Sequence, residues 1–130
     1  KGMDVAVTFD ENGIMGEAAV ANVGLVDDQG RLLCPEIKRI LPGTTMLAGL
    51  ELAARRTPTP LTVQERPIHR DEIATARDML LFTSSTLCVG VTHFDGIAVG
   101  QGEQRGRPGP VARWLKTALL NHLLEQGTPF

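Results

Sequence analysis

The sequence predicts an α+β, or mixed α/β, domain of 130 residues. The first part of the chain alternates between apolar and polar residues and contains tight-turn sequences such as Asp10-Glu11-Asn12-Gly13, which favours antiparallel strands. The end of the chain instead places apolar side chains at helical spacing. Because strand-like and helix-like segments do not alternate regularly, a simple parallel α/β unit is not expected.

The first segments are expected to form an antiparallel β-meander. Val5, Val7 and Phe9 point to one face of the first strand, and turns rich in Asp and Gly interrupt the strand-like runs. The predicted strands are Asp4–Phe9, Ile14–Glu17, Asn22–Val26 and Arg31–Cys34.

A helix and a buried strand are predicted in the middle of the chain. Thr45–Arg56 is amphipathic and ends at the prolines of Thr57–Pro60, and the apolar run Met79–Phe82 is typical of a buried strand. The predicted apolar side of the helix consists of Met46, Leu47, Leu50 and Ala54. The remaining predictions are a strand at Leu61–Arg66, a short helix at His69–Ala76, a hairpin of Val89–Phe94 and Ile97–Val99, and a loop at Gly100–Pro110.

The clearest element is the final helix, in which Pro110 occupies the first turn. Its apolar face follows the i, i+3, i+4, i+7 pattern. That face consists of Val111, Trp114, Leu115, Ala118, Leu119, His122 and Leu123. His122 is therefore interpreted as a packed residue rather than a catalyst.

Composition excludes several classes of function. The net charge is −2, with 13 basic and 15 acidic residues, and only 4% of residues are aromatic, so nucleic-acid binding is not expected. No apolar run reaches the roughly 18 residues of a membrane span, and the first residues show no signal-peptide pattern, so a cytoplasmic protein is expected. Cys34 and Cys88 lie in apolar segments without metal-ligand spacing, which predicts reduced, buried thiols and no metal site.

The segment Leu41-Pro42-Gly43-Thr44-Thr45 runs directly into the predicted helix. The first N–H groups of a helix have no partner within the helix, and the aligned peptide dipoles make this end partly positive. A phosphate or carboxylate therefore fits at Thr44 and Thr45. The alternative is that one of the two threonines simply caps the helix.

Two further positions are candidates for binding a polar ligand. Glu17 ends a strand before an apolar stretch, so it is either a partly buried carboxylate with a specific partner or an edge residue that faces water. The run Thr83-Ser84-Ser85-Thr86 follows the buried strand. Hydroxyl groups at that place form either an oxygen-binding pocket or a polar turn.

Motifs along nearly the whole chain resemble one known family. They are Gly13–Val23, with Gly-x-x-x-Glu and then Asn; Leu41–Thr45; Val63-Gln64-Glu65-Arg66-Pro67; Thr83–Thr86; and Asp95-Gly96 followed by Gly106–Val111. In order and spacing, these segments resemble the class IV, fold-type IV pyridoxal-phosphate enzymes. That family contains branched-chain and D-amino-acid aminotransferases and aminodeoxychorismate lyases.

The resemblance implies the C-terminal, cofactor-binding domain of the D-amino-acid aminotransferase-like fold, with a mostly antiparallel or mixed sheet, or a pseudo-barrel, and three helices. It implies that Glu17 bonds the pyridine nitrogen of pyridoxal 5′-phosphate and keeps it protonated. Thr44 and Thr45 would hold the phosphate through backbone N–H groups and the Thr45 hydroxyl. The full implied set is Glu17, Asn22, Gly43, Thr44, Thr45 and Ser84 around the cofactor, with Ser85 and Thr86 beside the substrate.

The resemblance also implies that the lysine that binds the cofactor covalently is missing here. Lys1, Lys38 and Lys116 match no catalytic position, so residues 1–130 are expected to be one domain whose N-terminal partner domain is absent. The implied reaction is amino-group transfer between an amino acid and a 2-oxo acid in a homodimer, with this chain inactive alone. Two alternatives remain open, namely an aminodeoxychorismate lyase-like enzyme and a non-catalytic phosphate-binding or assembly module.

Overall fold

A five-stranded sheet forms the centre of the protein. The computed structural model describes residues 6–18, 21–36, 40, 43–56, 60–84 and 86–125. The sheet has the order β5-β4-β3-β6-β7, in which β5 runs parallel to β4 and the other pairs are antiparallel. The strands are β3 (Asn22–Val26), β4 (Leu32–Cys34), β5 (Val63–Glu65), β6 (Asp78–Thr83) and β7 (Leu87–Gly90). The prediction of a mixed, mostly antiparallel sheet in an α+β fold is therefore confirmed.

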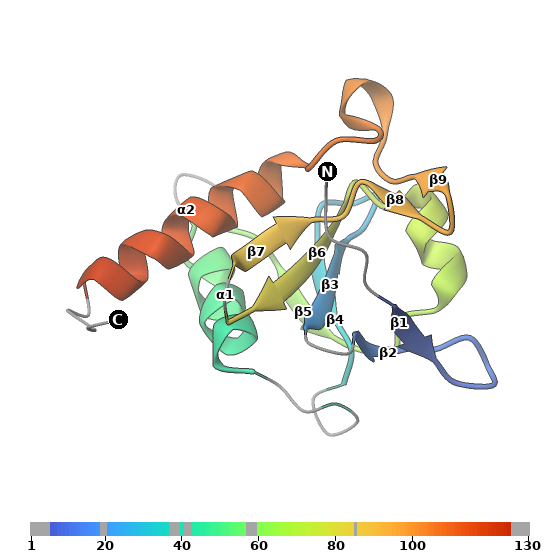
Figure 1. Cartoon of the computed structure of the whole chain (residues 1–130), viewed down its shortest axis with the longest axis horizontal. Helices are drawn as coiled ribbons and strands as arrows, with labels where there is room; N and C mark the ends of the chain where they lie inside the picture. Colours follow the sequence, from blue (N-terminus) through green and yellow to red (C-terminus); the bar gives the residue numbers. More distant parts are fainter. Residues whose placement is uncertain are drawn as a thin grey trace.

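Two helices lie on one face of this sheet (Figure 1). They are α1 (Thr44–Ala54) and α2 (Pro110–Glu125). Strand β6 divides the core, because Leu80 and Phe82 pack toward the helices whereas Met79 and Leu81 pack toward the opposite face. Since both faces are covered, all six residues of β6 are buried, which confirms the predicted buried strand.

Smaller elements cover the opposite face of the sheet (Figure 1). They are β1 (Val7–Phe9), β2 (Met15–Ala18), the 3-10 helix η2 (Arg70–Thr75), β8 (His93–Phe94) and β9 (Ile97–Ala98); a second 3-10 turn, η3 (Gly102–Gln104), follows. The guanidinium of Arg70 lies 5.0 Å from the ring centre of Phe9 and 5.5 Å from that of Phe94, and it pairs with Asp95 at 2.5 Å. Arg70 thus joins the two hairpins by stacking as well as by charge.

The predicted meander is wrong in one respect, because it divides into two sheets after β2. Ala18 and Ala21 exchange backbone hydrogen bonds of 3.0 and 3.4 Å, which reverses the chain between β2 and β3. Strands β1 and β2 consequently form a separate ribbon, whereas β3 and β4 belong to the central sheet. The predicted first residues of the meander, Asp4 and Val5, lie outside the described residues.

The predicted strand Val89–Phe94 is also divided in the structure. Strand β7 ends at Gly90, and the Val91 N–H makes a further bond of 2.8 Å to the Met79 carbonyl. The Thr92 carbonyl then accepts the N–H of Val99, which turns the chain into the separate hairpin β8–β9.

The predicted buried side of α1 is confirmed for Met46 and for Leu50, which packs against the core, but not for Leu47 and Ala54. Met46, Gly49 and Ala53 are buried, whereas Leu47 is 44% exposed and Ala54 is exposed. Gly49 faces the core, and its lack of a side chain leaves room for the ring of Phe82. An added Cβ at this position would lie 2.6 Å from a ring carbon. Apolar periodicity counts side chains, so it missed a contact that depends on the lack of one.

Helix α2 begins at Pro110 as predicted, and a distant carboxylate stabilises its start. Asp78, buried at the start of β6, accepts the backbone N–H of Ala112 at 3.0 Å. Burial raises the pKa of Asp78, although the N–H groups of Ala112 and Gly109 act in the opposite direction. A side chain at Gly109 would collide with this carboxylate, since an added Cβ would lie 2.4 Å from its carbon.

The far end of α1 packs against α2 through an aromatic contact. The guanidinium of Arg56, which follows α1, lies 5.3 Å from the ring centre of Trp114 on α2.

The apolar face predicted for α2 faces the core. Its residues Val111, Leu115 and Leu119 are buried, and His122 is half-buried.

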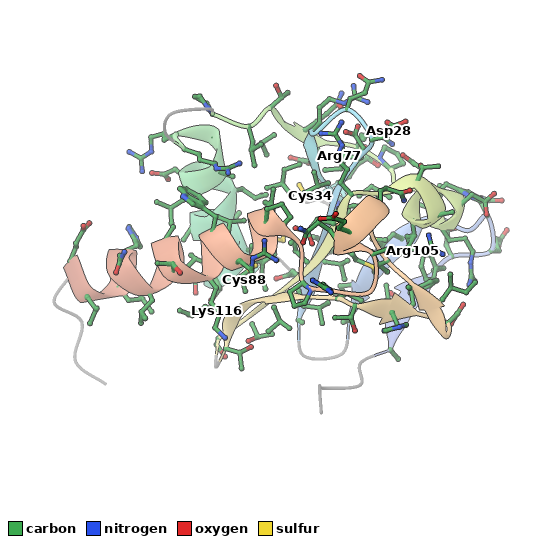
Figure 2. The ribbon with its side chains drawn as sticks, turned by 90° about the horizontal axis from the view of Figure 1, so that it is seen from above. Asp28, Cys34, Arg77, Cys88, Arg105 and Lys116 are labelled. Atoms are coloured by element: carbon green, nitrogen blue, oxygen red, sulfur yellow. The ribbon has the colours of Figure 1, made fainter. Side chains whose placement is uncertain are left out.

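Both cysteines are free and buried, as predicted (Figure 2). Cys34 lies on β4 and Cys88 on β7, and two strands of the sheet separate them. Burial raises the pKa of Cys34 to about 11 and that of Cys88 to about 12. The reactive thiolate form is therefore suppressed at both positions.

The predicted helix His69–Ala76 is the 3-10 helix η2, and a capping box closes its start. Nδ1 of His69 accepts the Asp71 N–H at 3.1 Å, and the Glu72 carboxylate accepts the His69 N–H at 2.9 Å. Glu72 also accepts two hydrogen bonds from Arg66, at 2.6 and 3.1 Å. The hydrogen bonds from Arg66 are the main cause of a lowered pKa of Glu72.

Replacing Glu72 with glutamine is expected to lower the free energy of unfolding by about 1 kcal/mol at neutral pH. Because the folded-state pKa of Glu72 lies below its ordinary value of 4.5, this contribution is present above that value and disappears as the pH falls through the folded-state pKa. Urea unfolding at neutral and acidic pH measures both effects. The control is Glu51→Gln, which removes the exposed Arg55–Glu51 pair and should change the free energy by less than about 0.5 kcal/mol. Equal effects of the two substitutions would contradict this prediction.

Candidate functional site

A pocket of about 330 Å³ opens where four segments meet, a volume typical of small-molecule sites. The end of β2, the start of β3, the start of α1 and the end of β6 form its walls. The lining residues are Glu17, Ala18, Ala21, Asn22, Gly43, Thr44, Thr45, Phe82, Thr83 and Ser84.

The start of α1 forms one wall of the pocket. Gly43 is the N-cap residue, in an extended conformation, and it makes no side-chain cap. The alternative that Thr44 or Thr45 is the capping residue is therefore wrong, because Thr44 is already the first helical residue. Backbone N–H groups in the first turn of a helix lack partners within the helix, and here this turn lines the pocket. The geometry suits an anion.

Glu17 lies on β2, half-buried, and lines a second wall of the pocket. The Thr8 hydroxyl donates to the Glu17 carbonyl at 2.9 Å and accepts the Glu17 N–H at 3.0 Å, which fixes this part of the strand. Gly16 permits this approach, since an added Cβ there would lie 2.5 Å from the Thr8 hydroxyl. Of the two interpretations of Glu17, the partly buried carboxylate with a specific partner is confirmed.

Asn22 is one such partner of Glu17, and it also contacts the start of α1. Its Nδ2 lies 3.4 Å from Oε1 of Glu17, and its Oδ1 accepts the Gly43 N–H at 2.8 Å. The side chain is buried, with 6% of the residue exposed.

The hydroxyl-rich segment after β6 is both a polar turn and part of the pocket wall. Thr83 and Thr86 form a hydrogen bond of 2.6 Å between their hydroxyls, and the Thr83 hydroxyl also accepts the Thr86 N–H at 2.9 Å. Thr83 and Ser84 line the pocket, whereas Thr86 does not. Ser85, which the resemblance assigns to the substrate, lies outside the described residues.

The structure thus brings the six residues assigned to the cofactor into one pocket from segments distant in sequence. Four lining residues, Ala18, Ala21, Phe82 and Thr83, are absent from that assignment. Phe82 could have been found, because alternation along the buried strand places it on the same face as Leu80, toward α1. Ala18 and Ala21 could have been found from the resemblance, because they stand where the family usually has small polar residues that line the cofactor.

Potential metal ligands are not clustered in the described part of the chain. No group of three or more His, Cys, Asp or Glu side chains there could hold a metal ion. None of the described helices is long and apolar enough to cross a membrane.

Comparison with known proteins places these features in a family. The chain is 26% identical over 115 residues to the D-alanine aminotransferase of Bacillus licheniformis, a match that covers 88% of this chain and 38% of that protein. The branched-chain amino acid aminotransferase of Escherichia coli has a similar structure, with a TM-score of 0.78 and 29% identity over 90% of this chain and 37% of that one. The chain therefore spans less than two-fifths of the length of these relatives.

The branched-chain amino acid aminotransferase from Thermobaculum terrenum, whose structure was determined in the PLP-form (holo-form), also has a similar fold. Its TM-score is 0.80, with 24% identity, and the match covers 95% of this chain and 38% of that one. The sequence pattern of the family described as Amino-transferase class IV matches residues 1–94, which is most of the chain. The chain belongs to the class IV aminotransferase family.

Proposed function

We propose that this chain is the cofactor-binding part of a pyridoxal-phosphate-dependent aminotransferase, which transfers an amino group between an amino acid and a 2-oxo acid. The observation that carries the proposal is the pocket itself. One wall is a helix start suited to an anion, and another wall carries the carboxylate of Glu17. Pyridoxal 5′-phosphate has matching groups, a phosphate at one end and a basic ring nitrogen at the other.

The residues present fit this cofactor by the chemistry of their donors and acceptors. When bound, the cofactor supplies an electron sink for the carbanion formed as the substrate loses its α-proton. The Glu17 carboxylate accepts a hydrogen bond from the protonated ring nitrogen and keeps that nitrogen charged. The first-turn N–H groups of Thr44 and Thr45, the Thr45 hydroxyl and the Ser84 hydroxyl hold the phosphate.

The rest of the reaction depends on a preceding domain and on the second copy of a homodimer. We assign the lysine that binds the cofactor covalently to that domain, so the present chain is inactive alone and acts as one domain of a cytoplasmic enzyme. In this proposal Ser85 and Thr86 bind the substrate, and Ser85 is the residue assigned to its carboxylate. The Thr86 hydroxyl also forms a hydrogen bond of 2.6 Å with the Thr83 hydroxyl.

The test is a titration of the 130-residue chain with pyridoxamine 5′-phosphate, followed by the absorbance of the ligand. This probe lacks an aldehyde and therefore cannot react with Lys1, Lys38 or Lys116. Glu17→Ala and Thr45→Ala should each weaken binding roughly tenfold, since each removes a hydrogen bond to a charged group.

The matched controls are Glu103→Ala and Thr117→Ala, which replace an exposed carboxylate and an exposed hydroxyl outside the pocket. They should bind as the unmodified chain does. Absence of binding, or binding that neither Glu17→Ala nor Thr45→Ala weakens, would contradict the proposed cofactor site and favour a non-catalytic module.

A further inference from the structure

Asn22 lies between the two chemically distinct ends of the pocket. It begins β3 in the central sheet, and it contacts β2 through Glu17 and α1 through Gly43. Of the side chains that line the pocket, it is among the most buried polar ones, together with Thr83. Asn22 therefore connects the wall that carries Glu17 to the wall formed by the start of α1.

The orientation of the Asn22 amide follows from its partners. The Gly43 N–H can only donate, so the Asn22 atom 2.8 Å away must be the oxygen. The amide nitrogen then faces Oε1 of Glu17 at 3.4 Å, where a carboxylate accepts. Because both bonds use one planar group, a displacement of either wall is transmitted to the other.

The backbone at Gly43 is adapted to this contact. An added Cβ at Gly43 would lie 3.1 Å from Oδ1 of Asn22, so any larger residue would press on the oxygen that accepts the Gly43 N–H. Aspartate at position 22 would still accept that N–H, but it has no donor for Glu17 and would place a second negative charge beside it. Asparagine can accept the Gly43 N–H and donate to Glu17 at the same time, whereas aspartate can only accept.

We propose that Asn22 is a positioning residue that couples Glu17 to the start of α1, and so sets the spacing between the acid and the anion site. It would do so through its contacts to these two groups. The nature of the ligand rests on the proposed function, whereas the coupling concerns only residues of this chain.

The first test measures hydrogen exchange of the Gly43 amide by NMR in the ligand-free chain. Asn22→Ala should accelerate this exchange roughly five- to tenfold, because the acceptor is lost. Asn22→Asp should retain the protection of Gly43, and this variant also serves if Asn22→Ala fails to fold. The control is Asn121→Ala, an exposed asparagine on α2, which should leave Gly43 unchanged. Unchanged exchange in Asn22→Ala would overturn the proposal.

The second test asks whether a change at Glu17 reaches Gly43 through Asn22. Glu17→Gln should shift the Gly43 amide proton resonance in the otherwise unmodified chain, and should leave it nearly unchanged in the Asn22→Asp background. If Asn22 only stabilised the fold, the effect of Glu17→Gln on the Gly43 resonance would not depend on the residue at position 22. An equal shift in both backgrounds would overturn the coupling.

The third measurement relates the coupling to ligand binding. Asn22→Asp and Glu17→Gln should each weaken binding of pyridoxamine 5′-phosphate roughly tenfold, and the double variant should lose much less than the product of the two factors. Independent, multiplicative losses would overturn the positioning role. If the unmodified chain does not bind this ligand, the proposed function fails for this chain while the two NMR tests still decide the coupling.

Discussion

Gly109→Ala is expected to lower the free energy of unfolding by about 2–4 kcal/mol, because the added methyl group would enter the space of a buried carboxylate. Its Cβ would lie 2.4 Å from the carboxyl carbon of Asp78. Asp78 is 2% exposed and cannot move to solvent without losing its bond to the Ala112 N–H. The expected result combines overpacking with loss of the cap of α2. Urea unfolding followed by circular dichroism measures it.

A double-mutant cycle separates the collision from other effects of the extra methyl group. Asp78→Ala alone should also destabilise the chain, since it removes the acceptor at the start of α2. In the Asp78→Ala background, however, Gly109→Ala should cost much less, because its collision partner is gone. Gly96→Ala is the comparison variant: φ is +79° there and nothing lies within 4 Å of an added Cβ, so only backbone strain of about 1 kcal/mol remains. Additive losses in the cycle would refute the collision.

Gly49→Ala should both destabilise the protein and weaken ligand binding. The added Cβ would lie 2.6 Å from a ring carbon of Phe82, which is buried and lines the pocket. Alanine favours helix by about 1 kcal/mol over glycine, but overpacking costs about 1–3 kcal/mol, so a net loss near 1 kcal/mol is expected. Because α1 must shift or Phe82 must turn, the two walls lose their spacing and affinity for pyridoxamine 5′-phosphate should fall at least tenfold.

A second substitution that removes the contact between position 49 and the Phe82 ring tests this explanation. Phe82→Leu removes the ring, so Gly49→Ala should be tolerated better in that background than alone. Leu47→Ala, on the exposed side of α1, is the control and should leave affinity unchanged. A Gly49→Ala variant with undiminished affinity would show that the helix position does not control the pocket.

Local signals predicted much of this fold. The turn after Phe9, the apolar run of β6 and the proline at the start of α2 each act over a few residues, and the structure confirms them. Much of the candidate site could also be predicted from the sequence, because its polar groups stand at the ends of predicted elements. The helix start at Thr44 and the hydroxyl run after Phe82 are the clearest examples.

What could not be predicted depends on contacts between distant residues. The Asn22 bond to Gly43 spans 21 residues, and the Asp78 bond to Ala112 spans 34. No periodicity encodes such pairs. The buried side of α1 was predicted only in part for a related reason, since Gly49 contributes a close approach rather than an apolar side chain. The division of the meander likewise depends on the backbone reversal at Ala18 and Ala21, which carries no turn motif.

The contact between Arg56 and Trp114 has an optical consequence. The chain contains one tryptophan and no tyrosine, so its near-ultraviolet emission comes almost entirely from this single indole. That indole meets the end of α1, and the eleven residues of the helix, about 16 Å long, separate it from the pocket-lining start. Emission will therefore change when the two helices part during unfolding. It is well suited to following the stability variants, while the ligand's own absorbance reports binding.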